Sequence, residues 1–346
     1  MINKILSYFS HDIGIDLGTA NVLVYVKGKG ILIREPSVVA VHKKSKEVLA
    51  VGTEAKRMLG KTPQNIVAIR PLRHGVISDF SAAEKMILHF IRLVHSIPSK
   101  MPKIPKPRIV IGVPSGVTSV ERKAVIDAAK NAGAREVFLL EEPMAAAIGA
   151  ELPITEPRGT MIVDMGGGTC EIAVISLGGI VVNKSIRVAG DELDMDIVTY
   201  AKSKYNLLLG ERSAEEIKLA VGNAIETEDE EKYKYLMRGR DLKSGLPRSI
   251  EITPAEVREA LKGSISRIIG SIKDAIEETP AELMTDIVRD GLVLAGGTSQ
   301  LRGLDRLMSM ELKIPVRIAK DPMTCVVKGC GRVLDDFVLL NKVKIA

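Results

Sequence analysis

The sequence predicts an α/β fold made of two similar lobes, and two observations lead to this prediction. First, apolar strand segments alternate with amphipathic helical segments along most of the chain, an order typical of α/β proteins. Second, one strand–turn–strand pattern occurs twice: residues 13–24 read IGIDLGTANVLV and residues 162–174 read IVDMGGGTCEIAV. Each copy has an apolar strand, an acidic residue, a turn rich in glycine and threonine, and a second apolar strand. The repeat indicates a duplicated pair of domains.

The first repeat opens a half-chain in which strands and helices alternate. Residues 36–51 combine short apolar strands with a lysine-rich turn, and residues 54–59 predict a short helix, so this stretch is expected to form a small inserted subdomain. Gly133 suits the position just after a helix end, where a left-handed backbone is common. Periodicity predicts four further elements: a helix over 81–94, a strand over 109–114, a helix over 119–132 and a strand over 136–140.

The second repeat opens a similar series. Ser213 resembles the start of a capping box and predicts the beginning of a helix, and the acidic run 226–231 predicts a solvated loop edge. The other predicted elements are strands over 179–188, 291–295 and 316–319, and helices over 193–205, 254–261, 265–278, 304–312 and 325–337.

Composition narrows the class of protein. A length of 346 residues suggests about two domains, and 46% hydrophobic with 27% charged residues suits a well-packed core. The net charge of +6 and the pI near 9.0 fit an anionic partner such as membrane lipid or nucleic acid. Only 3% of residues are aromatic and tryptophan is absent, which disfavours stacking on nucleic-acid bases. We therefore predict no nucleic-acid partner.

The compartment follows from the cysteines and from the lack of a long apolar run. Cys170, Cys325 and Cys330 show no CxxC spacing, which favours a reducing compartment and argues against a zinc site. No apolar segment approaches the roughly 20 residues of a membrane-spanning helix, and the first residues lack the pattern of a signal peptide. The sequence therefore predicts a cytoplasmic protein.

The two repeats are candidate phosphate-binding turns. Glycines let the backbone approach a phosphate closely, successive N–H groups form an anion-binding nest, and a threonine hydroxyl adds a donor. A Gly/Thr-rich hairpin turn with no ligand is the alternative for either copy alone, and the pair together favours binding. The candidate nucleotide contacts in the two turns are Gly18, Thr19, Ala20, Asn21, Gly166, Gly167, Gly168 and Thr169.

Two aspartates are the candidate magnesium ligands. Asp16 and Asp164 end the first strand of each repeat, so each is expected to face the cleft from its own lobe. Mg²⁺ keeps several waters and binds through few carboxylates together with phosphate oxygens. The two aspartates can therefore hold a hydrated ion between the lobes, through water, and both are also assigned to the catalytic group.

Glu142 is the third candidate catalytic residue. It precedes Pro143 and so suits the first turn of a helix, where a carboxylate can orient or deprotonate a water at the phosphate site. Glu141 is its rival, and a carboxylate that only complements the helix dipole is the structural alternative.

Five further residues complete the candidate nucleotide site. Gly296, Gly297 and Thr298 follow an apolar strand, so the glycines would let the backbone lie against a nucleotide. Glu215 and Lys218 lie three residues apart on one helix face, where they would reach ribose or adenine, or else form an exposed ion pair with each other.

Taken together, these motifs resemble those of the actin–Hsp70–hexokinase superfamily and, within it, the MreB family of bacterial actins. The resemblance runs from about residue 12 to residue 336. The segments that carry it are 16–21, 141–147, 164–169, 213–218 and 296–299.

The resemblance implies an actin-like fold of duplicated ribonuclease-H-like lobes, divided into four subdomains around a nucleotide cleft. The implied boundaries are 1–34, 79–148 and 320–346 for subdomain IA, 35–78 for IB, 149–184 and 249–319 for IIA, and 185–248 for IIB.

The resemblance also implies binding of ATP with Mg²⁺ and slow hydrolysis coupled to filament assembly. Glu142 then matches the residue that positions the lytic water, and Glu215 and Lys218 match nucleoside contacts. Family members form paired antiparallel protofilaments at the inner face of the cell membrane, where they organise the cell-wall elongation machinery and maintain cell shape. Two residues depart from the family pattern: Cys170 stands where the family often has threonine, and Cys330 lies near the start of the last helix, with an expected effect on the nucleotide fit or the fit between the lobes. Neither removes a group needed for phosphate or Mg²⁺ chemistry, so ATP binding is expected to survive.

Two segments are candidates for membrane attachment. Residues 1–10 place Ile2, Ile5, Leu6 and Phe9 on one face of a short amphipathic helix, and residues 96–107 interleave prolines and apolar residues with lysines. The alternatives are a segment docked on the protein's own core and an ordinary surface loop.

Two other functions use the same fold. A phosphotransferase of the sugar-kinase type would need an acceptor site of acidic and amide side chains, which the sequence does not show. A chaperone ATPase would need a peptide-binding domain after the nucleotide-binding lobes, and the chain ends at Ala346. The filament-forming ATPase is therefore favoured.

Overall fold

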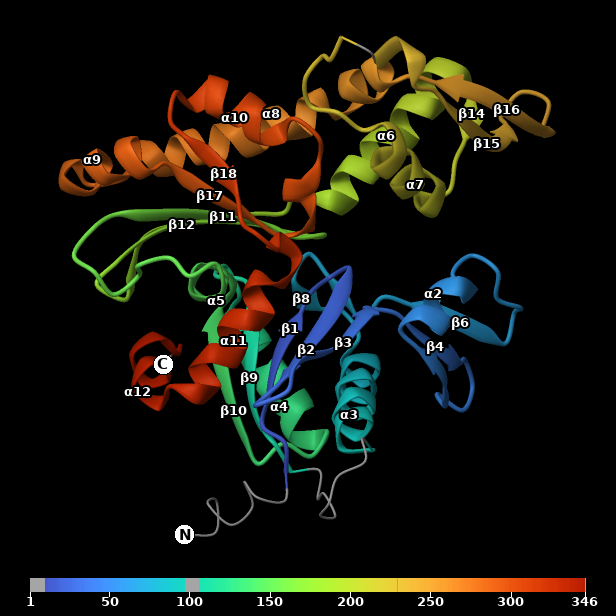
Figure 1. The fold of residues 1–346 in the computed structure, drawn as a ribbon. Coiled ribbons are helices and arrows are strands. Elements are labelled where there is room, and N and C mark those ends of the chain that lie inside the picture. Colours follow the sequence, from blue (N-terminus) through green and yellow to red (C-terminus); the bar gives the residue numbers. More distant parts are fainter. Residues whose placement is uncertain (1–9, 97–105, 229, 346) are drawn as a thin grey trace.

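Two lobes with the same sheet topology make up the protein (Figure 1). The computed structural model describes residues 10–96, 106–228 and 230–345. Each lobe contains a five-stranded sheet in which three antiparallel strands are followed by two parallel ones. This is the predicted duplicated α/β fold.

The strand order is the same in both sheets. In lobe I it is β3 (Gly30–Pro36), β2 (Asn21–Val26), β1 (Ile13–Leu17), β9 (Arg108–Val113) and β10 (Glu136–Glu141). In lobe II it is β13 (Gly179–Ile186), β12 (Cys170–Ser176), β11 (Thr160–Met165), β17 (Leu292–Ala295) and β18 (Val316–Ile318).

The matching topology places the two aspartates at equivalent points. Asp16 pairs with Gly112 on the parallel neighbour β9, and Asp164 pairs with Ala295 on the parallel neighbour β17. Alternate residues of a strand share a face, so Asp16 lies on the same face as Gly14. A Cβ on Gly14 would lie 2.9 Å from the backbone of Cys330. The Asp16 face of β1 is therefore turned toward the layer between the lobes.

Two helices fill the layer between the sheets. They are α5 (Glu142–Gly149) and α11 (Cys325–Asp335), which lie between the lobes in Figure 1. Their backbones touch at glycines: a Cβ on Gly149 would lie 1.8 Å from the carbonyl oxygen of Cys325, and one on Gly329 would lie 1.9 Å from that of Ala145. Such close packing joins apolar residues of both sheets into one core.

Further helices pack around the two sheets. In lobe I these are α3 (Phe80–Ser96) and α4 (Ser119–Asn131), and in lobe II they are α8 (Pro254–Glu277), α9 (Ala281–Asp290) and α10 (Leu304–Leu312), with α12 (Phe337–Val343) after α11. Capping boxes start α4 and α8, because Thr118 with Glu121 and Thr253 with Glu256 satisfy the first free N–H groups. No described helix is long and apolar enough to cross a membrane.

A small sheet extends each lobe beside the cleft. In lobe I it comprises β4 (Val39–His42), β5 (Val48–Val51) and β6 (Ile66–Ile69) with α2 (Thr53–Met58), followed by the hairpin β7 (Leu72–Arg73) and β8 (Val76–Ile77). In lobe II it comprises β14 (Leu207–Leu208), β15 (Tyr235–Asp241) and β16 (Pro247–Ile252) with α6 (Gly190–Tyr205) and α7 (Glu211–Val221). The subdomain boundaries given above stay a prediction.

Three helix predictions were wrong in detail. The capping box at Ser213 does not exist, because α7 begins at Glu211 after Gly210, which makes no side-chain cap. The predicted helices 254–261 and 265–278 are one helix, α8, since Gly263 faces open space while the buried stripe continues through Ser264. The predicted helix 325–337 ends at Asp335 because Asp336 is extended and caps α12.

The acidic run 226–231 is only in part the predicted solvated edge. Glu226 is exposed, but Glu230 begins a short 3₁₀ helix (Glu230–Lys232) and is buried. Both of its carboxylate oxygens accept hydrogen bonds from Arg258, each at 2.7 Å. This bidentate ion pair compensates the cost of burying the charge. Both membrane-attachment candidates have most of their residues, 1–9 and 97–105, outside the described residues.

Candidate functional site

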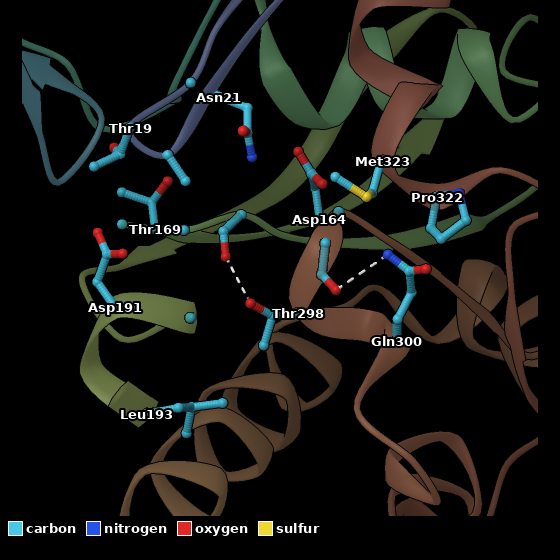
Figure 2. A pocket seen from close by; sticks show the side chains of 18 of the residues that line it. Thr19, Asn21, Asp164, Thr169, Asp191, Leu193, Thr298, Gln300, Pro322 and Met323 are labelled. Atoms are coloured by element: carbon cyan, nitrogen blue, oxygen red, sulfur yellow. Dashed lines mark hydrogen bonds between the residues drawn. The ribbon is translucent and has the colours of Figure 1, made fainter. Parts of the chain in front are cut away.

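A cavity of about 480 Å³ lies between the lobes, within the size range of small-molecule sites. Figure 2 shows side chains from both lobes converging on it, with Thr19 and Asn21 from lobe I and Asp164, Thr169 and Thr298 from lobe II. Every candidate site residue lines this one cavity: Asp16, Gly18, Thr19, Ala20, Asn21, Glu142, Asp164, Gly166, Gly167, Gly168, Thr169, Glu215, Lys218, Gly296, Gly297 and Thr298.

The two phosphate turns touch each other across the cleft. A Cβ on Gly167 would lie 2.7 Å from the Cβ of Ala20, and one on Gly168 would lie 2.6 Å from the hydroxyl of Thr19. Only glycine leaves room for this approach. The Thr19 hydroxyl also accepts a hydrogen bond of 2.9 Å from the N–H of Gly75 in the β7–β8 turn. Backbone groups from three segments therefore surround the space where the two turns meet.

The third glycine turn, residues 296–298, and the first turn of α6 both form hydrogen bonds to the second phosphate turn. The hydroxyl of Thr298 donates to the carbonyl oxygen of Gly166 at 2.7 Å, a bond drawn in Figure 2. The N–H of Asp191 donates to the carbonyl oxygen of Gly167 at 2.8 Å. This places the N-terminus of α6 at the cavity, where its dipole favours a negative charge.

Four carboxyl groups gather beneath these turns without a cationic partner. Asp16, Glu142, Asp164 and Glu171 take part in no ion pair within the part of the chain that the structure describes. Burial raises the pKa of Asp16 and of Glu171 to about 7. Burial, and then the neighbouring acids, raise the pKa values of Glu142 and Asp164 well above the usual range. The cluster is therefore a site where a cation would be strongly stabilised.

The donor set fits a hydrated magnesium ion rather than a directly coordinated metal. Among the described residues, no three His, Cys, Asp or Glu side chains lie close enough to hold a metal ion. Asp16 and Asp164 instead offer one carboxylate from each lobe at the cavity. Mg²⁺ retains several waters and takes its remaining ligands from few carboxylates and from phosphate oxygens. These two residues would therefore hold it through water.

Glu142, rather than Glu141, reaches the cavity. Glu142 is buried at the start of α5 and lines the cavity, while Glu141 accepts hydrogen bonds from Ser115 at 3.0 Å and from Asn183 at 3.4 Å. A buried carboxyl with a raised pKa is suited to accept a proton from a water molecule. The geometry therefore favours Glu142 in that role.

Glu215 and Lys218 do not form the exposed pair that was the alternative. The Lys218 ammonium lies 2.8 Å from Asp194 and donates to the carbonyl oxygen of Gly190 at 2.8 Å. Glu215 instead pairs with Lys56 at 3.1 Å, so this ion pair spans the cleft from α7 to α2. Both side chains are thus tied to other elements at the cavity wall.

Several lining residues escaped the sequence analysis. Asp191 and Asp194 follow Gly190 at the start of α6, and burial raises the pKa of Asp194 to about 6, partly offset by Lys218. Met323 and Pro322 form the opposite wall in Figure 2. The sequence signal that could have pointed to Asp191 and Asp194 was Gly190, a glycine at the start of a helix. No local sequence pattern identifies Met323 as a lining residue, because its position at the cavity depends on how the two lobes pack together.

The unusual cysteines do not reach the cavity. Cys170 and Cys330 are fully buried, and neither lines it. The Cys330 sulfur lies in the layer between the lobes, where a Cβ on Gly112 would be 3.7 Å away. Since neither cysteine lines the cavity, the remaining expectation is an effect on the packing between the lobes, which stays a prediction.

Paired lobes of identical topology, with glycine turns from both meeting in one cleft, define an actin-like protein. A family profile described as MreB/Mbl protein matches residues 10–342. The chain belongs to the MreB/Mbl family. It is 51% identical to the cell shape-determining protein Mbl of Bacillus subtilis (strain 168) over 338 residues, covering 98% of this chain and 100% of that protein. It is 49% identical to the cell shape-determining protein MreB of Escherichia coli (strain K12) over 339 residues, covering 97% and 96% of the two chains.

Solved structures agree with this assignment. MreB5 of Spiroplasma citri bound to ADP superposes with a TM-score of 0.89 at 37% identity, covering 96% of this chain and 98% of that one. A MamK double helical filament gives a TM-score of 0.78 at 21% identity, covering 94% and 99%, and supports the fold alone. The protein is thus an actin-like cytoskeletal protein of a family that determines cell shape. The sugar-kinase alternative gains no support.

Proposed function

We propose that the protein binds ATP with Mg²⁺ in the cavity between the lobes and hydrolyses it slowly in step with filament assembly. The observation that carries the proposal is the meeting of two equivalent glycine turns and two equivalent aspartates in one cavity. The similar MreB5 protein has been solved with ADP and with AMPPNP, which supports a nucleotide as the occupant.

The cavity residues divide into two proposed groups. Backbone N–H groups of the two turns and the hydroxyls of Thr19 and Thr169 would hold the phosphates. The walls formed by Glu215 with Lys218 and by the 296–298 turn would hold the nucleoside, in a cavity large enough for it.

Three carboxylates would carry the chemistry. Asp16 and Asp164 would hold the hydrated Mg²⁺, which when bound neutralises charge on the phosphate oxygens. Glu142 would orient the attacking water and accept its proton. Its buried position keeps the carboxyl away from bulk solvent and directed at the cavity.

The proposed cellular role follows from the family. The protein would assemble with copies of itself into paired antiparallel protofilaments on the inner face of the cell membrane and organise the cell-wall elongation machinery. The protein would then be cytoplasmic and peripheral to the membrane. The net charge of +6 suits an anionic lipid surface. Weak membrane contacts repeated along a filament would add up through avidity.

The test is sedimentation combined with electron microscopy of the purified protein. Samples contain Mg·ATP, Mg·ADP or no nucleotide, each with and without anionic liposomes, and Asp164→Ala is the matched control. ATP-promoted double filaments on the liposomes, absent in the control variant, are expected. A wild-type protein that stays monomeric under all conditions would overturn the assembly role, and one that binds no nucleotide would overturn the proposed site.

A further inference from the structure

Glu171 is a fully buried acid beside the cavity that the proposed chemistry does not use. It lies on β12 directly opposite Asp164 on β11, and it does not line the cavity. Directly paired residues of neighbouring strands face the same side of a sheet, so Glu171 shares its face with Asp164. A buried carboxylate is costly unless hydrogen bonds compensate it, so its bonding partners indicate its role.

The hydrogen-bond donors to Glu171 come from both lobes. One carboxylate oxygen accepts the hydroxyl of Ser185 at 2.7 Å, and the other accepts the N–H of Ser115 at 3.2 Å. Ser185 belongs to lobe II, whereas Ser115 follows β9 in lobe I. Glu171, which lies two residues after the phosphate turn of lobe II, thus connects that lobe to a loop of lobe I.

The connection continues to the start of α5. The hydroxyl of Ser115 donates to Glu141 at 3.0 Å, and Glu141 is the residue before Glu142 and the N-cap position of α5. The lobes are in close contact at this point, because a Cβ on Gly116 would lie 3.3 Å from the Cβ of Ser185. Hydrogen bonds therefore connect Glu171, through Ser115 and Glu141, to the start of the helix that carries Glu142.

We infer that Glu171 is a positioning residue for hydrolysis, which fixes the placement of Glu142 through Ser115 and Glu141. This inference rests on the proposed function. Glu171 does not touch the cavity and acts only through these neighbours. Displacing a reacting group by about 1 Å can cost about 100-fold in rate, so a break in this path should lower the hydrolysis rate while nucleotide affinity is kept.

Two substitutions at Glu171 separate positioning from proton transfer. Glu171→Met keeps the approximate volume but removes every acceptor, so the N–H of Ser115 loses its partner. Glu171→Gln keeps an oxygen for that N–H, while its amide group donates to the Ser185 hydroxyl, which can turn to accept. The glutamine cannot act as a base. Rescue by glutamine therefore identifies a positioning role.

The experiment measures affinity for Mg·AMPPNP by fluorescence titration and phosphate release from Mg·ATP in single turnovers. Glu171→Met should lower the hydrolysis rate at least tenfold with affinity within threefold of wild type, and Glu171→Gln should stay within threefold in both. Ser115→Ala should also slow hydrolysis, and adding it to Glu171→Met should lower the rate no further, because both lie on one path. Glu230→Gln, at a buried glutamate that does not line the cavity, is the control and should keep the wild-type rate.

Three results would overturn the inference while the proposed function stands. Glu171→Met could hydrolyse ATP at the wild-type rate, or Glu171→Gln could be as slow as Glu171→Met. The third is a loss of nucleotide affinity in Glu171→Met that parallels its loss of hydrolysis rate. If Glu171→Met does not fold, Ser115→Ala at the wild-type rate would overturn the inference in its place. A wild-type protein that binds Mg·AMPPNP but releases no phosphate from ATP would instead overturn the proposed hydrolysis, and the inference with it.

Discussion

Replacing Asp16 by asparagine should stabilise the protein when no nucleotide or Mg²⁺ is present. Burial raises the pKa of Asp16 from 3.8 to about 7, so the folded state binds more protons than the unfolded state between those values. Stability then falls as pH rises through this window, because ionising the folded carboxyl costs free energy. Below about pH 4 the carboxyl is protonated in both states, and the penalty disappears.

The magnitude follows from the size of the pKa change. A difference of about 3 pH units corresponds to about 4 kcal/mol at pH 8. Asp16 is half-buried and keeps access to water in the cavity, so about 2 kcal/mol remains after allowing for solvent screening. With an unfolding entropy of roughly 2 cal/mol/K per residue, this equals a rise in Tm of about 3 °C for Asp16→Asn.

Thermal unfolding from pH 5 to pH 8 tests the prediction. Without ligand, the Tm advantage of Asp16→Asn should grow with pH, and Mg·ADP should reverse the ranking by stabilising only the wild type. Asp241→Asn is the matched control. Hydrogen bonds from Ser244 and Arg248 lower the pKa of Asp241, so its loss should destabilise the protein at pH 8. An Asp16→Asn variant that melts below the wild type at pH 8 without ligand would refute the reasoning.

Three further outcomes are expected at the cavity. Asp164→Ala should abolish Mg²⁺-dependent ATP binding in calorimetric titrations, and measurable binding that EDTA still weakens would contradict its assignment. Glu142→Ala should bind ATP normally but hydrolyse it at least about 100-fold more slowly, and equal rates of phosphate release would exclude its role. Lys218→Met should weaken binding of a fluorescent ATP analogue about tenfold, because it removes a proposed nucleoside contact and leaves the buried Asp194 unpaired at the cavity wall; unchanged affinity would place Lys218 outside the site.

The sequence predicted the cavity lining well because its chemistry is local. A glycine turn that can hold a phosphate is specified by consecutive residues, as in 18–21 and 166–169, and the strand before each turn fixes where the aspartate lies. Both turns, both aspartates and Glu142 could therefore be found without coordinates. The fold class followed in the same way, since the duplicated pattern implied duplicated topology.

Features that depend on contacts between distant segments could not be predicted. Glu171 gains its role from Ser115, 56 residues away in sequence and in the other lobe. Glu230 is buried only because Arg258 reaches it from α8. The continuity of α8 through Gly263 likewise depends on packing along its buried stripe, which overrides the weak helix propensity of one glycine.

The duplication also explains why hydrolysis should depend on lobe I. The topologies match strand for strand, so Asp16 and Asp164 are equivalent, and α11 after β18 corresponds to α5 after β10. The acids near the starts of these two helices differ, however: Glu142 is the first residue of α5, and Asp321 precedes the short 3₁₀ helix (Pro322–Thr324) that leads into α11. Asp321 pairs with Lys328 at 3.0 Å, and hydrogen bonding to Thr324 and Lys328 lowers its pKa. Glu142 is buried, has no ion-pair partner among the described residues, and has a raised pKa. In the proposed mechanism the two lobes would therefore supply equivalent aspartates to hold Mg²⁺, while the carboxyl proposed to accept the proton comes from lobe I.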